Sequence, residues 1–554
     1  MFCRDPLTAS LVPCTSGTPV CPAGQVPAAA PATGCVPLGV PWHCPPGFEV
    51  DSTKAAVAPA PPPCKPDPTV CGSDEYGGVA PAANEVFVDG NAPAGGNGKR
   101  KTPFDTLQQA LAAVPVGGTV AVAAGIYSGN LTLNKAMTLR GRCAALVRID
   151  GGKGQVTLRF GQPAGSVVQV MGLQVTGARG GLFAQSAGET VATSLYVHST
   201  RFMAVAGLAV GGKLLLQDSV VGPHASDFEP AAIGVSFEQG FTAHLQRVRI
   251  GGARGNGLIA HDPKTVVTAT ELLIDSTAVA DSSLTQGNGI QVQDGASLSL
   301  TSCRLAANRS AGLSTLGAAT QVEARGLLID GTLPAADTLQ VGIGANAISG
   351  GQLSLAGARL TGNRTAGLSV VDVDSQARAF GVRIDGTRAA IGSKGNEFGT
   401  GAIAYKAALL DLQGCRIDNN QAVGVYVADG PVLVRNSLIL AGIPGKFPRT
   451  DATGRMLVGD VILADGVVLA RSAPALFDRV VVAGHARACI LADAGHLELL
   501  STAATGCHFG LATQVGAQLV QKSVLLHGNT VNFSADGGLA VPTAPQVAIA
   551  GAGD

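Results

Sequence analysis

A segment of about 18 residues recurs in this chain roughly every 55 residues, and this repeat limits what the chain can fold into. Copies begin at Leu245, Leu300, Leu355 and Leu412, and the last three read LTSCRLAANRSAGLSTLG, LAGARLTGNRTAGLSVVD and LQGCRIDNNQAVGVYVAD. A second unit recurs between them with the same period, as LLIDST, LLIDGT and VRIDGT. Self-similarity at a fixed period is typical of proteins built from stacked repeats. The sequence therefore predicts a solenoid with two unlike coils, one short and one long, in each repeat.

Short runs closed by Gly, Asn or Asp, without helical spacing between them, predict an all-β fold of parallel strands. Neighbouring coils of such a fold lie ~4.8 Å apart. Cys303 and Cys415 occupy the same position two repeats apart, so we expect them to be ~20 Å apart and to be buried free thiols. Cys489 and Cys507 are separated by 18 residues, about one short coil, which favours a disulfide between them.

Charge and hydropathy exclude two classes of function. The chain has 38 basic and 38 acidic residues, so no net field attracts nucleic acid. Its mean hydropathy is +0.30, but Gly, Asp, Arg and Pro interrupt every apolar run before it is long enough to span a membrane. We therefore expect neither a nucleic-acid partner nor a membrane span.

Residues 1–83 form a segment rich in cysteine and proline. Such a segment is typical of a disulfide-stapled region in an oxidising compartment. Its cysteine count is odd, which makes Cys143 a plausible eighth partner. Cys3 is either one of the disulfide partners or the lipid-bearing cysteine of a bacterial lipoprotein. The cysteines that we expect in disulfides are Cys3, Cys14, Cys21, Cys35, Cys44, Cys64, Cys71, Cys143, Cys489 and Cys507.

A helix is expected directly after the first strand, within residues 84–118. Thr102 is a suitable N-cap and Pro103 suits the first helical position. The surrounding stretch VFVDGNAPAGGNGKRKTPFDTLQQALAAVPVGGTVAVAAGIYSGNLTLNKAMTLRGR resembles the start of right-handed parallel β-helix proteins of the pectate-lyase-like superfamily. The resemblance implies an N-terminal capping helix, coils over residues 119–533 and a tail at 534–554. It implies no single activity, because the superfamily includes lyases, hydrolases, epimerases, tailspikes and adhesins.

Five insertions break the repeat at equal spacing, so they are expected to project from one edge of the solenoid. They begin near Gly222, Thr277, Thr332, Thr387 and Gly442. The first contains three candidates for acid–base catalysis or calcium binding, namely His224, Asp227 and Glu229. The last two contain candidate binding residues, namely Lys394, Glu397, Lys446, Arg449 and Asp451. The alternative is that all eight are ordinary solvated loop charges.

Four arginines recur at one position of the repeat: Arg249, Arg304, Arg359 and Arg416. An outward ladder of arginines could bind a polyanion such as a uronate chain. Aspartates recur nearby, at Asp275, Asp330, Asp385 and Asp418, so local ion pairing is the plainer interpretation.

Catalytic motifs of β-helix enzymes are missing from the sequence. The N-T-D, D-D, G-H-G and R-I-K strings of polygalacturonase-type hydrolases are absent, and His261 begins H-D-P rather than the D-P-H of alginate epimerases. We expect no cofactor and no metal site. The leading hypothesis is a secreted or cell-surface protein, such as an adhesin, that is non-catalytic and binds a glycan or a protein partner through its loop edge. The alternatives are a polysaccharide lyase or hydrolase, and a structural subunit that forms oligomers.

Overall fold

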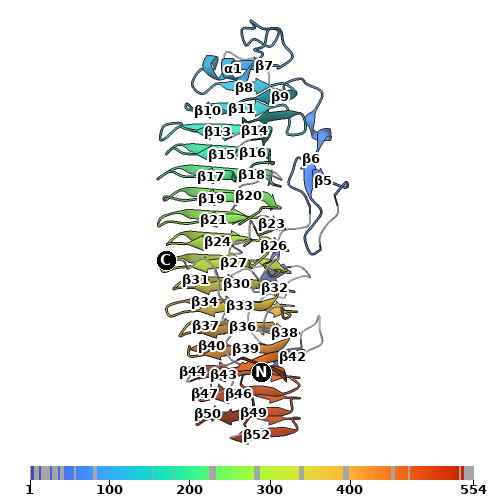
Figure 1. The fold of residues 1–554 in the computed structure, drawn as a ribbon, viewed down its shortest axis with the longest axis vertical. Helices are drawn as coiled ribbons and strands as arrows, with labels where there is room; N and C mark the ends of the chain where they lie inside the picture. Colours follow the sequence, from blue (N-terminus) through green and yellow to red (C-terminus); the bar gives the residue numbers. More distant parts are fainter. Residues whose placement is uncertain are drawn as a thin grey trace. The chain divides into compact units, whose positions relative to one another are not determined.

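The computed structural model shows a chain made almost entirely of short strands (Figure 1). It divides into two compact units, each of which we describe separately: an N-terminal unit of Val40–Leu300, and a C-terminal unit of Thr301–Asp554 that also includes Met1–Gly39. The structure describes residues 2–4, 11–13, 25–27, 35–37, 43–54, 58–78, 84–152, 154–177, 179–223, 233–279, 287–335, 342–390, 399–450, 456–471, 474–535 and 538–541.

Coils of the N-terminal unit contribute strands to two parallel sheets, which we call sheet A and sheet B. Sheet A contains β10 (Leu131–Leu133), β13 (Val156–Phe160), β15 (Gly180–Ala184), β17 (Met203–Gly207), β19 (Ile233–Phe237), β21 (Leu258–Ala260) and β24 (Ile290–Gln293). Sheet B contains β7 (Glu85–Val88), β8 (Thr119–Val122), β9 (Gly125–Ser128), β11 (Met137–Gly141), β12 (Val147–Asp150), β14 (Val167–Thr176), β16 (Glu189–Val197), β18 (Lys213–Val221), β20 (Thr242–Gly251), β22 (Val266–Thr270), β23 (Leu273–Asp275) and β25 (Ser297–Thr301).

The C-terminal unit repeats the same two-sheet arrangement. Its sheet A contains β27 (Ala311–Leu316), β30 (Ile343–Ile348), β33 (Thr365–Val371), β36 (Gly399–Tyr405), β39 (Ala422–Ala428), β43 (Met456–Ala470), β46 (Ala488–Asp493), β49 (Phe509–Gln514) and β52 (Val531–Ala535), with β42 (Gly445–Thr450) antiparallel to β43. Its sheet B contains β26 (Arg304–Ala306), β28 (Gln321–Arg325), β29 (Leu328–Asp330), β31 (Gln352–Ala356), β32 (Arg359–Thr361), β34 (Gln376–Phe380), β35 (Arg383–Asp385), β37 (Leu409–Gln413), β38 (Arg416–Asp418), β40 (Val432–Arg435), β41 (Leu438–Leu440), β44 (Pro474–Asp478), β45 (Val481–Ala483), β47 (His496–Leu500), β48 (Ala503–Thr505), β50 (Gln518–Lys522) and β51 (Leu525–His527).

In-register pairing of like strands makes each unit a stack of parallel coils. In the C-terminal unit Leu305 pairs with Ile329, which pairs with Leu360 on the next coil, and all three are fully buried. Buried and outward residues alternate along sheet B strands such as β28, β31 and β34, so like residues form columns inside the solenoid. The predicted fold class, an all-β parallel β-helix, is confirmed.

A left-handed bend separates the two sheet B strands of each coil. In the C-terminal unit successive bends fall at Ser302, Gly326, Gly357, Gly381 and Gly414, with φ between 52° and 63°. Their spacings are 24, 31, 24 and 33 residues, obtained by subtracting successive positions. Short and long coils therefore alternate in the way that the repeat indicates.

The capping helix begins later than the sequence predicts. Helix α1 spans Leu107–Ala113, and its N-cap is Thr106, whose hydroxyl accepts from the Gln109 amide. The Thr102 N-cap was a wrong prediction, because Thr102 is in a turn and bridges Lys99, while Phe104 forms an isolated bridge with Val88. Pairing of this segment with β7 holds it extended and delays the helix by one turn.

Two disulfides lie in the cysteine-rich segment, and one of them attaches the segment to the coils of the N-terminal unit. Cys44–Cys64 joins the chain before β5 (Phe48–Val50) to the first residue of its hairpin partner β6 (Cys64–Pro66). Cys71–Cys143 joins the 3-10 helix η1 (Pro68–Cys71) to the turn after β11. Phe48 and Cys64 then pack against Val220 of β18. The hairpins β1 (Phe2–Arg4) with β2 (Leu11–Pro13) and β3 (Gln25–Pro27) with β4 (Cys35–Pro37) are described by their backbone alone. The predicted disulfide partners Cys3, Cys14, Cys21 and Cys35 thus have no described side chains.

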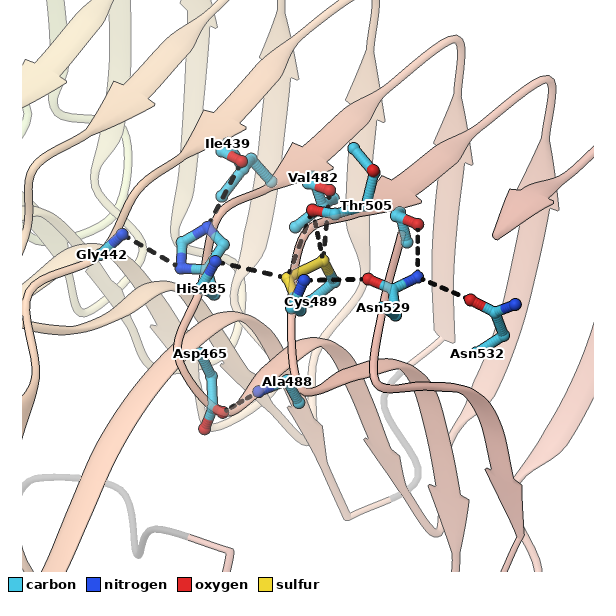
Figure 2. The surroundings of a disulfide bond; sticks show 12 residues. Ile439, Gly442, Asp465, Val482, His485, Ala488, Cys489, Thr505, Asn529 and Asn532 are labelled. Atoms are coloured by element: carbon cyan, nitrogen blue, oxygen red, sulfur yellow. Dashed lines mark hydrogen bonds between the residues drawn. A yellow bond between two sulfur atoms is a disulfide. The ribbon is translucent and has the colours of Figure 1, made fainter. Parts of the chain in front are cut away.

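A third disulfide, Cys489–Cys507, lies in the last coils, beside the buried imidazole of His485 (Figure 2). The His485 amide donates to Cys507 Sγ at 3.3 Å, and the Gly442 amide donates to His485 Nδ1 at 3.3 Å. Burial lowers the pKa of His485 to about 4. Cys303 and Cys415 are buried free thiols, as their column position predicts.

The outer face of sheet A in the C-terminal unit is also buried. Ile403, Tyr426 and Val468 alternate with interior residues along β36, β39 and β43, yet each is at most 2% exposed. Among the described residues, Leu539 and Val541 pack against this cluster. Arg487 donates to the Ala540 carbonyl at 2.7 Å and holds this part of the C-terminal tail on the sheet. Within the described residues no helix has the length and apolar character needed to cross a membrane.

Candidate functional site: a histidine between two carboxylates

Most of the loop residues that the sequence singles out cannot be placed. Six lie outside the described residues: His224, Asp227, Glu229, Lys394, Glu397 and Asp451. Lys446 and Arg449 lie on β42, which is described by its backbone alone. These eight residues therefore stay predictions, and the site below is built from described residues.

The four repeated arginines are ion-paired with the repeated aspartates. The pairs are Arg249–Asp275 at 2.7 Å, Arg304–Asp330 at 2.9 Å, Arg359–Asp385 at 2.7 Å and Arg416–Asp418 at 2.8 Å. The geometry thus favours local pairing over an arginine ladder that is free for a polyanion.

Arg249 is also enclosed, because only 6% of its side chain is exposed. Its guanidinium donates to both Asp275 oxygens, to the carbonyls of Pro61 and Pro62, and to Cys64 Sγ. A guanidinium has five N–H donors, and these contacts use all of them. Arg249 therefore anchors the cysteine-rich segment to sheet B and has no donor left for an outside ligand.

A different cluster lies directly after the ends of β19 and β21 of sheet A in the N-terminal unit, and it is formed by Glu238, His261 and Asp262. His261 Nε2 lies 3.2 Å from Glu238 Oε2, and His261 Nδ1 lies 3.2 Å from Asp262 Oδ1. The imidazole is therefore placed between two carboxylates. The exposed fraction of the side chain is 27% for His261, 18% for Glu238 and 36% for Asp262, so solvent molecules and small ligands can reach all three.

Adjacent coils bring these residues together. Phe237 of β19 pairs with Ala260 of β21, so the residues that follow them, Glu238 and His261, are neighbours on successive coils. The His261 amide continues the ladder by donating to the Phe237 carbonyl at 3.0 Å. Asp262 begins the next turn with φ 75°, and its second oxygen accepts from the Gln239 amide at 3.0 Å. The backbone thus fixes all three side chains.

Electrostatics favour a positive charge on His261. The hydrogen bond to Glu238 outweighs partial burial and, together with Asp262, raises the pKa of His261 to about 9. At neutral pH the imidazole is therefore protonated between its two acidic neighbours. Such a cluster can donate and accept hydrogen bonds, take part in acid–base chemistry or exchange its proton for a cation.

Amide side chains extend the polar surface to the next coil. Gln291 of β24 accepts from Asn256 at 3.1 Å and from Asn288 at 2.8 Å, and it donates to Gln293. Ser236 of β19 donates to Glu238 at 3.2 Å. We call the outer surface formed by Glu238, His261, Asp262, Gln291 and Gln293 the polar patch; Ser236 is buried and contacts the patch through Glu238.

Sequence reasoning missed this patch because it considered His261 only within a motif of fixed order. Glu238 and His261 are 23 residues apart in the sequence. They are neighbours in the structure because one coil of the solenoid has this length at that point. The one available signal was two polar residues, each directly following an apolar strand, at a separation near one short coil.

Comparison with known proteins gives matches of structure only. No model of a known protein family matches the sequence, and no curated protein matches it. Three solved structures that match are a pectate lyase, Pel9A (12% identity, 74% of this chain and 81% of that chain, TM-score 0.24); the A-module of the Azotobacter vinelandii mannuronan C-5 epimerase AlgE6 (12%, 77% and 91%, 0.26); and the periplasmic alginate epimerase AlgG (8%, 76% and 83%, 0.28). At these values the matches carry no inference about activity, and the assignment of a parallel β-helix rests on the coils themselves.

Proposed function

We propose that this protein is secreted or attached to the cell surface and binds a glycan, without cleaving it, through the polar patch. The observation that carries the proposal is the register of β19, β21 and β24, which places Glu238, His261 and Gln293 at matching positions of three successive coils, next to a column in which Ile259 separates Ser236 from Gln291. Carboxylates, amides and an imidazole together can both donate to and accept from sugar hydroxyl groups. A rigid ladder holds them in place, so binding costs little ordering entropy.

The disulfides support the proposed secreted or cell-surface location. Three described pairs, Cys44–Cys64, Cys71–Cys143 and Cys489–Cys507, need an oxidising environment to form and persist. Attachment through a lipid at Cys3 stays an alternative to plain secretion and is tested by mass spectrometry of the N-terminal peptide of the native protein.

The binding proposal is tested on a glycan array, followed by calorimetry with the best ligand. We expect Glu238→Gln and Gln291→Ala to weaken binding by at least 10-fold, about 1.4 kcal/mol. Gln169→Ala is the matched control, because Gln169 is an exposed glutamine on β14 of sheet B in the same unit. No glycan binding by the wild-type chain, or equal binding by all variants, contradicts the proposal.

A second candidate function is a polysaccharide lyase or hydrolase, favoured by the position of His261 between two carboxylates. A protonated imidazole beside a carboxylate is a suitable pair for general acid–base catalysis. This candidate predicts new reducing ends or unsaturated uronates in a polysaccharide digest, and loss of both in His261→Ala. If the digest contains no products and the chain binds the polysaccharide, the enzymatic candidate is excluded and the binding function is kept.

The insertion loops are a further surface for the same ligand. Lys394→Ala and Glu397→Ala test this surface on the same array. If these variants bind the glycan more weakly and Gln291→Ala binds it normally, the binding site is the loop edge rather than the polar patch.

A further inference from the structure

We propose that Glu238 and His261 bind a divalent transition-metal ion such as Zn²⁺, and that Asp262 orients the imidazole for it. The site goes beyond glycan binding, because an ion can occupy it with no sugar present. It is the one group of three metal-ligating side chains found among the described residues.

Distances in the cluster match those of a metal site. One ligand atom from each of the three residues lies within 4.8 Å of the others. Glu238 Oε2 and His261 Nε2 are 3.2 Å apart. Two ligands bound to one tetrahedral zinc ion at ~2.0–2.1 Å lie about 3.4 Å from each other, so an ion fits against both with only a small adjustment.

Asp262 holds the other ring nitrogen. Its Oδ1 lies 3.2 Å from His261 Nδ1, on the side of the ring away from Glu238. Histidines that bind metals through one nitrogen usually donate the other N–H to a carboxylate or a carbonyl, which fixes the tautomer and raises ligand basicity. Asp262 is in turn fixed by the Gln239 amide, so the orienting contact is built into the turn.

The ligand types select the class of ion. An imidazole with a carboxylate suits Zn²⁺, Co²⁺ or Ni²⁺, whereas Ca²⁺ and Mg²⁺ prefer oxygen ligands alone. Both ligands are partly exposed, so water can occupy the remaining coordination positions of the ion. A site with such open positions differs from a structural metal site, in which protein ligands fill every position. Of the cysteines whose side chains are described, six are in disulfides, and the other two, Cys303 and Cys415, are buried.

The test is a titration of the metal-stripped, untagged full-length chain with ZnCl₂ by calorimetry, and with CoCl₂ by visible absorption. We expect a site that disappears in His261→Ala and in Glu238→Gln, a nearly isosteric change that keeps the coil intact. Asp262→Asn is expected to weaken binding by about 10- to 100-fold, as loss of an orienting carboxylate does. His244→Ala is the control, since His244 lies in the same unit and contacts Thr268 rather than an acidic residue.

Three results overturn the metal proposal. These are no site in the wild-type chain, unchanged binding in His261→Ala, and a Ca²⁺ site of equal affinity that survives His261→Ala. Metal binding and glycan binding are measured separately, and Gln291→Ala is expected to affect only the glycan. Failure of either proposal is therefore distinguishable from failure of the other.

Discussion

Two histidines of this chain have pKa values displaced in opposite directions, and the cause in each case is the local environment. His261 is placed between two carboxylates, which raise its pKa to about 9. His485 is 1% exposed beside a disulfide, and desolvation lowers its pKa to about 4. The same side chain is thus a stabilised cation in one unit and a neutral buried group in the other.

For His261 we expect the C2–H resonance of the folded protein, in histidine-labelled samples, to titrate near pH 9. Because the folded pKa lies above the unfolded value of about 6.5, the charged imidazole stabilises the fold below pH 6.5. That contribution is lost as pH rises through 9. Glu238→Gln should move the titration back towards 6.5. A wild-type resonance that titrates near 6.5 means that the carboxylate contacts do not persist in solution.

For His485 the sign is reversed, because its folded pKa lies below the unfolded value. Stability contributed by the neutral form is complete above about pH 6.5 and is lost as pH falls towards 4, since the unfolded chain takes up a proton that the folded chain excludes. We expect the free energy of unfolding, measured with urea, to fall more steeply between pH 6.5 and 4 for the wild-type chain than for His485→Gln. Parallel pH profiles for the two proteins contradict the burial of this imidazole.

At the scale of elements, two buried asparagines connect their coils to the preceding coils at Thr332 and Thr387, where two of the insertions begin. Asn420 accepts from the Thr387 amide at 2.9 Å and donates to the Ile384 carbonyl at 3.0 Å. Asn363 accepts from the Thr332 amide in the same way, at 3.1 Å. Backbone groups that the strands leave without partners are satisfied by these side chains.

We expect Asn420→Ala to lower the free energy of unfolding by about 1–3 kcal/mol, because a buried donor and a buried acceptor lose their partner. Chemical unfolding monitored by circular dichroism measures the change. Gln413→Ala is the control, since this exposed residue of β37 should change stability by less than ~0.5 kcal/mol. Equal effects of the two substitutions would show that the asparagine contacts contribute nothing.

How far the sequence determines these elements depends on whether they repeat. Asn308, Asn363 and Asn420 occupy one position of the repeat, so their turn location could be predicted from the sequence. Their reach to the previous coil could not, because it depends on the path of that coil. Helix α1 was predicted one turn too early, because the pairing of Phe104 with Val88 overrides the local signal at Thr102. The polar patch combines residues that do not repeat, so its formation needed the register of β19 and β21.

At the scale of the whole molecule, cysteine chemistry distinguishes structural cross-links from packing residues. The Cys71–Cys143 disulfide closes a loop with a sequence separation of 72, and Cys489–Cys507 closes one of 18. Loop-closure entropy predicts about 4 kcal/mol for the longer loop and about 3 kcal/mol for the shorter one. Cys303 and Cys415 are the packing residues: both are buried outside any disulfide, and they lie four strand steps apart, from β26 to β38 along sheet B.

This arrangement predicts the outcome of alkylation without reductant. In the folded chain, iodoacetamide should not reach Cys303 or Cys415, because both thiols are buried and burial raises the pKa of Cys415 to about 12. In guanidinium both should be labelled fully, while peptides containing Cys71 with Cys143 and Cys489 with Cys507 are recovered linked. Protein purified from its native host is the right material, since it also tests whether the chain resides in an oxidising compartment. A linked Cys303–Cys415 peptide would mean that the strand register between them is wrong, because four steps of ~4.8 Å hold their backbones far beyond the ~7 Å limit of a disulfide.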